Sequence, residues 1–290
     1  MAGNIEVLLA GGKEGYETGR TSIGSYAALT VGNNEHFSED RKPVNQDGIL
    51  IATKGPYTIL AVADGVSGAK NSHLGSQHVL EGLAAFNFGT VAPHELDEAV
   101  SNELVRLDST MIKGAATTVL MTILWNAGER IGQMKVYNIG DGMAYLQNDK
   151  YVASPLTQPG QGRYNLPFQM DGGLRDRHEH PTEFMRKINY FNVAESLPAG
   201  IRLKGNPMMF FQMENTFGFA NGSNIIITTD GLRRIFEEDV TRYLAKRNPA
   251  QCVKDLVSFA KLNPESVAAG KPNTRQFNDD IGVIAFTVGL

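Results

Sequence analysis

The chain has little cysteine, no excess of basic residues and no long apolar segment. Cys252 is the only cysteine among 290 residues, which excludes intramolecular disulfides and thiolate zinc clusters. No apolar run approaches the roughly 18 residues that a transmembrane helix needs, so we expect no membrane contact. The net charge of −4 lacks the basic excess of a nucleic-acid-binding protein. These absences favour a cytoplasmic protein whose partners include no nucleic acid.

Length and composition describe an ordinary globular protein. The chain is 42% hydrophobic and 20% charged, and 290 residues suffice for one large domain or two. The stretch at about 151–222 is rich in proline, glycine and asparagine and shows few clean periods. We predict a single domain over 1–290, elaborated by an insertion at about 151–222, and we expect a monomer.

Short apolar stretches bounded by glycine and proline predict strands along most of the chain. They cover 25–31, 49–52, 57–63, 117–125, 134–139, 225–229 and 281–288. Apolar residues at helical spacing predict helices over 96–111 and 249–260 and, more weakly, over 74–86. Groups of strands separated by helical segments predict an α+β fold, with sheets packed together and helices outside.

Aspartates at the ends of these strand-like runs are the most informative feature of the sequence. They occur in Asp47-Gly48, Asp64-Gly65, Asp141-Gly142 and Asp230-Gly231, and Asp279-Asp280 opens the final apolar run. An Asp-Gly pair is also the strongest short-range signal for a two-residue hairpin turn. Helical patterns follow Asp64 and Asp230, which predicts exits from a strand to a helix. New strands follow Asp47 and Asp141, so hairpin turns are expected there.

Carboxylates at several strand ends can meet at one rim of a sheet. Two unit charges ~4 Å apart repel by ~4 kcal/mol at an effective dielectric near ~20, so such a cluster needs cations. Oxygen ligands without sulfur or imidazole favour hard cations, Mg²⁺ or Mn²⁺. The sequence therefore predicts a site for hard divalent cations.

Six motifs occur in the order of a known family, each at a fitting strand boundary. They are Asn45-Gln46-Asp47, 62–68, 114–118, 138–142, 228–232 and 279–284. Together they resemble the metal-dependent protein phosphatases of the PPM (type 2C) family, especially the bacterial members, from about residue 20 to the C-terminus. The resemblance implies a four-layer α-β-β-α sandwich of two antiparallel sheets with helix pairs outside, and a two-metal centre at one end.

The resemblance also implies ligands for these metals. Asp64 would bridge two Mg²⁺ or Mn²⁺ ions, and the backbone carbonyl of Gly65 would bind the second ion. Asp230 and Asp279 would complete the coordination of the first.

Further roles follow from the same resemblance. Asp47 would be catalytic through metal-bound water, and Asp141 would help Asp230 to hold a third, weaker ion. Family members usually carry an arginine shortly before the Asn-x-Asp motif, where it binds the substrate phosphate through paired hydrogen bonds. We assign this catalytic and phosphate-binding role to Arg41, although Lys42 stands at the commoner spacing.

The sequence departs from the family pattern at three places. Val66 replaces a histidine that many eukaryotic members carry and that is a proposed general acid. Gly142-Met143 replaces the common Ser-Arg pair beside the third metal. Asp280 replaces the usual asparagine, and we expect it to support the ligands rather than to bind metal.

The predicted function is that of a signalling serine/threonine protein phosphatase, a phosphoric monoester hydrolase. It would cleave phosphomonoesters of a phosphorylated protein by direct attack of a water activated by the dinuclear metal centre. Val66, Gly142 and the shifted Arg41 leave open a catalytically weak regulatory module that binds phosphoproteins. The insertion leaves open a phosphatase that acts on small phosphorylated metabolites, because it could close over a pocket.

Overall fold

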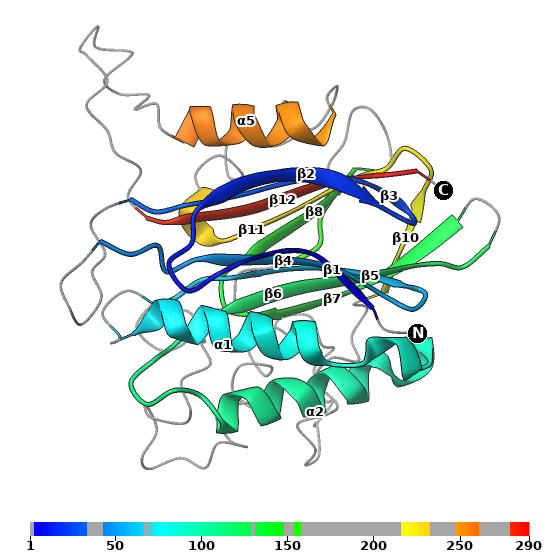
Figure 1. The fold of residues 1–290 in the computed structure, drawn as a ribbon. Helices are drawn as coiled ribbons and strands as arrows, with labels where there is room; N and C mark the ends of the chain where they lie inside the picture. The colour runs from blue at the N-terminus through cyan, green and yellow to red at the C-terminus, as the bar shows by residue number, and fades with distance from the viewer. Residues whose placement is uncertain are drawn as a thin grey trace, which may run out of the picture.

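Two antiparallel sheets pack face to face, and helices cover both outer faces (Figure 1). The computed structural model describes residues 3–33, 43–66, 69, 71–128, 131–147, 154–157, 216–232, 248–260 and 279–289. Helices α1 (Ser72–Ala85) and α2 (Leu96–Ser109) cover the first sheet, and α5 (Pro249–Ala260) covers the second. This arrangement confirms the predicted α+β sandwich. Within the described ranges, one outer face carries a helix pair and the other carries α5.

Each sheet has six strands. The order in the first sheet is β1 (Asn4–Leu9), β4 (Gly48–Lys54), β5 (Tyr57–Ala63), β6 (Val119–Asn126), β7 (Ile131–Ile139) and β10 (Thr216–Ala220). The order in the second is β2 (Gly15–Thr21), β3 (Gly24–Val31), β12 (Ile281–Val288), β11 (Asn224–Thr228), β8 (Met143–Gln147) and β9 (Ser154–Pro155). All neighbouring strands run antiparallel.

The central strands are apolar along their whole length because both of their faces are covered. Every residue of β5 is buried, since one face meets α1 and α2 and the other meets the second sheet. Strand β2 lies at an edge and is mostly polar and partly exposed, so the sequence pattern did not predict it. Of the predicted insertion at 151–222, only 154–157 and 216–222 are described, and they include β9 and β10.

Three hydrophobic clusters hold the layers together. Leu60, Leu120 and Ile284 belong to the cluster between the two sheets. A second cluster joins the first sheet to α1 and α2, and a third joins the second sheet to α5. Cys252 is buried in the third cluster beside Val283, so the single cysteine serves as core. Among the helices that the structure describes, none is long and apolar enough to cross a membrane.

The chain passes between the sheets at two points that matter for function. Strand β3 belongs to the second sheet and β4 to the first, while β7 belongs to the first and β8 to the second. Asp47 lies directly before β4, and Asp141 lies between β7 and β8. The hairpin turns predicted for Asp47 and Asp141 are therefore wrong. Sequence pattern shows that a new strand follows, but it does not show which sheet that strand joins.

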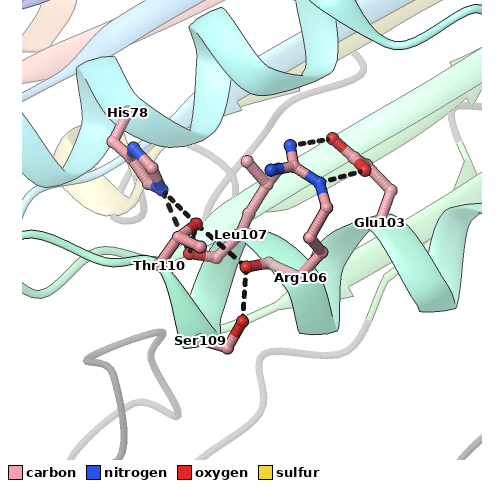
Figure 2. Close-up of polar contacts among 6 residues, drawn as sticks. All are labelled: His78, Glu103, Arg106, Leu107, Ser109 and Thr110. Carbon is pink, nitrogen blue, oxygen red and sulfur yellow. Dashed lines mark hydrogen bonds and ion pairs between the residues drawn. The ribbon is translucent and has the colours of Figure 1, made fainter.

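Polar contacts lock α1 against the end of α2, as Figure 2 shows. The His78 Nε2 atom lies 3.1 Å from the Leu107 carbonyl oxygen and 3.1 Å from the Thr110 hydroxyl. The Thr110 hydroxyl also donates to the Arg106 carbonyl oxygen at 2.9 Å, which caps the last turn of α2. Arg106 pairs with Glu103 one turn earlier. The helix pair therefore packs as one unit against the first sheet.

A partly buried ionic cluster fastens the other end of α2 to the sheet. Asp97, in the first turn of α2, accepts a hydrogen bond from the Lys135 ammonium at 2.5 Å and one from the Tyr137 hydroxyl at 3.0 Å. Lys135 and Tyr137 both lie on β7 and are buried. Each carboxylate oxygen of Asp97 therefore has its own donor.

Replacement of the Asp97 carboxylate should lower the stability of the protein and leave the rest of the structure unchanged. In Asp97→Asn the Lys135 ammonium loses its counter-charge, and the loss of a charge-assisted hydrogen bond costs about 1.5–3 kcal/mol. Urea denaturation should show this decrease in the free energy of unfolding. Unchanged stability would mean that the cluster adds nothing net to the fold.

Candidate metal centre and active site

Strand ends from both sheets meet at one rim of the sandwich. In the first sheet, the start of β4 pairs with the end of β5 (Gly48 with Ala63), and the start of β6 pairs with the end of β7. In the second, Thr228 at the end of β11 pairs with Met143 on one side and Val283 on the other. The aspartates that flank these ends are thereby collected at the same place.

Asp64, Asp141 and Asp230 come closest together. One carboxylate oxygen from each lies within 4.8 Å of the others. Asp64 follows β5, Asp141 lies in the β7–β8 connection, and Asp230 begins a 3₁₀ turn (Asp230–Leu232) after β11. Asp141 is buried, while the other two keep partial exposure. The predicted strand-to-helix exit at Asp64 is confirmed, since α1 follows it. After Asp230 the structure describes only the 3₁₀ turn, and most of the helical segment predicted there lies outside the described residues.

Every other carboxylate predicted for the site repels the negative charge of Asp64. Removal from bulk water raises the pKa of Asp64 well above its ordinary value, although its side chain keeps some exposure. Repulsion by Asp47, Asp230, Asp279 and Asp141 raises this pKa further. The five aspartates therefore share one electrostatic neighbourhood.

Asp47 is the most deeply buried member of this group. Burial raises the pKa of its carboxyl well above the ordinary value, and the charges of Asp280, Asp279 and Asp230 raise it further. A hydrogen bond from the Thr229 hydroxyl acts in the opposite direction. Two of the predicted positions, Arg41 and Lys42, lie outside the described residues.

The turn that carries Asp64 is held rigidly by the backbone. The Asp64 carbonyl oxygen accepts hydrogen bonds from the Thr117 hydroxyl at 2.7 Å and the Thr118 amide at 2.8 Å. The Gly65 amide donates to the Gln46 carbonyl oxygen at 3.2 Å. A Cβ atom on Gly65 would lie 2.8 Å from that same carbonyl oxygen, so a side chain does not fit there. Close approach of two chain segments explains the glycine after Asp64.

Thr229 connects Asp47 to the second sheet, and sequence reasoning missed this role. Its hydroxyl donates to Asp47 Oδ2 at 2.6 Å and accepts a hydrogen bond from the Gly282 amide at 2.9 Å. Because the hydroxyl both donates and accepts a hydrogen bond, it fixes the orientation of the Asp47 carboxylate. Thr229 stands directly before the Asp230-Gly231 pair, but that position alone does not indicate a contact with residue 47.

Asn138 supports Asp141 in a similar way. Its side-chain amide donates to the Gly140 carbonyl oxygen at 3.3 Å and to the Gly142 carbonyl oxygen at 3.1 Å, on both sides of Asp141. Gly140 has a φ of 126°, which favours glycine. A Cβ atom on Gly142 would lie 2.9 Å from the Leu120 Cβ atom. Close packing against Leu120 on β6 therefore accounts for the glycine at this position.

The donor set fits a hard divalent cation. Among the described residues, the charges that act on Asp64 all come from carboxylates, and three oxygens lie within 4.8 Å of one another. Carboxylate oxygens are the ligands that Mg²⁺ and Mn²⁺ prefer. Cations placed among these carboxylates would remove the repulsion that raises the pKa values of Asp47 and Asp64. The arrangement can therefore bind cations and hold a polarised water beside them.

The fold and the acidic rim define a layered α-β-β-α sandwich with a centre suited to cations. The chain belongs to the protein phosphatase 2C family, whose sequence pattern it matches over residues 36–258. The comparison with curated proteins gives no match.

Solved structures of bacterial phosphatases share the fold. PstP/Ppp of Mycobacterium tuberculosis superimposes with a TM-score of 0.54 at 18% identity, over 92% of this chain and 100% of that one. The catalytic domain of PstP, in complex with two manganese ions, gives the same score and identity, over 92% and 99%. Stp1 of Staphylococcus aureus gives 0.53 at 15% identity, over 94% and 100%. At these identities the likeness is one of fold.

The metal-free protein should be destabilised by its own site at neutral pH. Because the pKa of Asp64 is raised, the folded state holds this proton more tightly than the unfolded chain does. The stability contributed by Asp64 is full below the unfolded pKa of about 3.9 and is lost as pH rises through the folded pKa. Asp64→Asn should therefore be more stable than wild type in chelator, by a margin that grows with pH. Urea denaturation from pH 4 to 8 measures that margin, and a constant margin would contradict the expectation.

The hydroxyl of Thr229 should lower the pKa of the Asp47 carboxyl. Thr229→Val removes the hydrogen bond that lowers the pKa of Asp47, so this pKa should rise in the metal-free protein. The variant also leaves the Gly282 amide buried without its acceptor, at a cost of about 1–3 kcal/mol in stability. Carboxyl ¹³C NMR titration and urea denaturation measure the two effects. Thr229→Ser keeps the hydroxyl and should restore both.

Proposed function

We propose that the protein is a metal-dependent serine/threonine phosphatase that cleaves phosphomonoesters by direct attack of water. The observation that carries the proposal is the convergence of Asp64, Asp141 and Asp230, whose oxygens lie within 4.8 Å of one another. Membership of the protein phosphatase 2C family and the fold of the bacterial phosphatases support it.

The proposed ligands follow the family resemblance. Asp64 would hold both ions, the Gly65 carbonyl would serve the second, and Asp230 and Asp279 would complete the first. Asp141 shares a third, weaker ion with Asp230, and its short distance to Asp64 and Asp230 supports this assignment. The two manganese ions of PstP support Mn²⁺ or Mg²⁺ as the cations. When bound, such ions lower the pKa of a water and clamp the phosphoryl oxygens for in-line displacement.

The chain itself supplies orientation and charge. Asp47 accepts a hydrogen bond from the attacking water, and Thr229 keeps the carboxylate in place for that task. Arg41 is proposed to bind the phosphate through paired hydrogen bonds. No covalent enzyme intermediate is needed, and buried Cys252 is packed in the core rather than at the rim.

The proposed substrate is a phosphorylated protein, in agreement with the family. A monomeric state and a cytoplasmic location stay predictions. The metabolite phosphatase and the phosphoprotein-binding module remain the alternatives. The presence of Asp64, Asp230 and Asp279 favours turnover over mere binding.

Removal of the cations or of one carboxylate should abolish turnover. With Mn²⁺ a phosphothreonine peptide should be hydrolysed, and EDTA should stop the reaction. Asp230→Asn should lower kcat/KM by at least about a hundredfold, because loss of a ligand or its support costs about 10–100-fold or more in affinity or activity. Asp97→Asn, far from the rim, serves as the matched control and should keep wild-type kcat. Full activity in EDTA would refute the proposal.

Substrate class can be decided with the same preparation. A protein phosphatase should turn over phosphopeptides with a higher kcat/KM than sugar or nucleotide phosphates. The reverse order would favour the metabolite phosphatase. Calorimetric binding of Mn²⁺ without hydrolysis of any phosphoester would favour the binding module.

A further inference from the structure

Asp280 is a buried carboxylate at the start of β12 whose oxygens are both engaged by backbone amides. The Asn33 amide donates to Oδ1 at 2.8 Å, and the Gln46 amide donates to Oδ2 at 2.6 Å. All three residues are buried. These bonds join positions 247 and 234 residues apart in the chain.

The two amides stand at opposite ends of the same connection between the sheets. Asn33 follows β3 of the second sheet, and Gln46 stands one residue before Asp47 and β4 of the first. The Asp280 side chain therefore holds both ends of this connection at the start of β12. Asp279 is the residue directly before Asp280 in the chain. These two hydrogen bonds therefore join the segment that carries Asp47 to the segment that carries Asp279.

Gln46 extends the network to Asp64. Its carbonyl oxygen accepts the Gly65 amide at 3.2 Å and the Ser76 hydroxyl of α1 at 2.6 Å. The peptide groups of Gln46 thus lie between Asp280 on one side and the turn of Asp64 and Gly65 on the other. A shift of Gln46 would move the carboxylates on both sides of it.

We propose that Asp280 is a positioning residue that fixes Asp47 and the Asp64 turn relative to Asp279 through the amides of Asn33 and Gln46. The proposal rests on the proposed function for its kinetic consequences, but not for its structural ones.

The two amide donors match an aspartate better than the asparagine usual in the family. A carboxylate presents two acceptor oxygens, and here both face N–H donors. An asparagine has one acceptor, so its NH₂ group would face a second N–H group and leave that amide buried without a partner. The carboxylate of Asp280 adds repulsion to Asp47, and its two hydrogen bonds from backbone amides oppose that cost.

The test compares Asp280→Asn with Asp97→Asn. Both changes remove the charge of a carboxylate whose two oxygens each accept a hydrogen bond from a described residue, but only Asp280 lies at the rim. Loss of one charge-assisted bond corresponds to about 10- to 100-fold in an equilibrium constant. Asp280→Asn should weaken Mn²⁺ binding by about this factor in calorimetry. Asp97→Asn should leave Mn²⁺ affinity unchanged.

Amide exchange and kinetics distinguish positioning from general destabilisation. In Asp280→Asn the amide of Asn33 or Gln46 should exchange faster with solvent, while the β5 amides stay protected. With saturating Mn²⁺, kcat for a phosphopeptide should fall about tenfold or more while KM changes little, because Asp47 acts on the water rather than on the peptide.

Two results would overturn the proposal. One is wild-type exchange and Mn²⁺ affinity in Asp280→Asn. The other result is rapid exchange of both the Asn33 and the Gln46 amides in the native wild-type protein. This measurement applies even if the variant does not fold. A wild-type protein without phosphatase activity would refute the proposed function, whereas the exchange and calorimetry results would still decide the role of Asp280.

Discussion

Repulsion among buried carboxylates is the constraint on which the rest of the structure depends. Asp47 and Asp64 have raised pKa values because burial and neighbouring aspartates both oppose their charge. At an effective dielectric near ~20, each close pair costs on the order of several kcal/mol. A fold that keeps these carboxylates close together must hold them in place through contacts with neighbouring residues. The strands, the Thr229 hydroxyl and the backbone bonds around Gly65 supply that support.

This support is largely made of hydrogen bonds between segments that are distant in sequence. Thr229 bonds to a carboxylate 182 residues away, and Asp280 to amides 247 and 234 residues away. Such contacts fix the positions of the carboxylates at the rim. Preorganised charge of this kind is the usual source of catalytic power in a hydrolytic site.

Sequence alone predicted the parts of the molecule that depend on local pattern. Apolar runs marked the central strands, and the change to a helical pattern after Asp64 correctly identified the exit from β5 to α1. The hairpins expected at Asp47 and Asp141 were wrong, because an Asp-Gly pair reports local backbone preference and not the sheet that the next strand joins. Edge strand β2 was missed because its mostly polar sequence lacks a buried face.

The supporting residues could not be predicted, since their roles arise only from tertiary placement. Nothing near Thr229 in the sequence indicates a bond to Asp47, and the value of Asp280 depends on where Asn33 and Gln46 lie. The aspartates themselves were found because a family motif and a strand boundary coincide at each of them.

The carboxylates are drawn from both sheets, which has a mechanical consequence. Asp47 and Asp64 flank strands of the first sheet, Asp230 and Asp279 flank strands of the second, and Asp141 lies on a connection between them. Away from the rim, an apolar layer of described residues that includes Leu60 and Ile284 lies between the two sheets. Any sliding of one sheet over the other would therefore change the ligand distances directly. The distances among the carboxylates at the rim therefore depend on how the apolar layer packs between the two sheets.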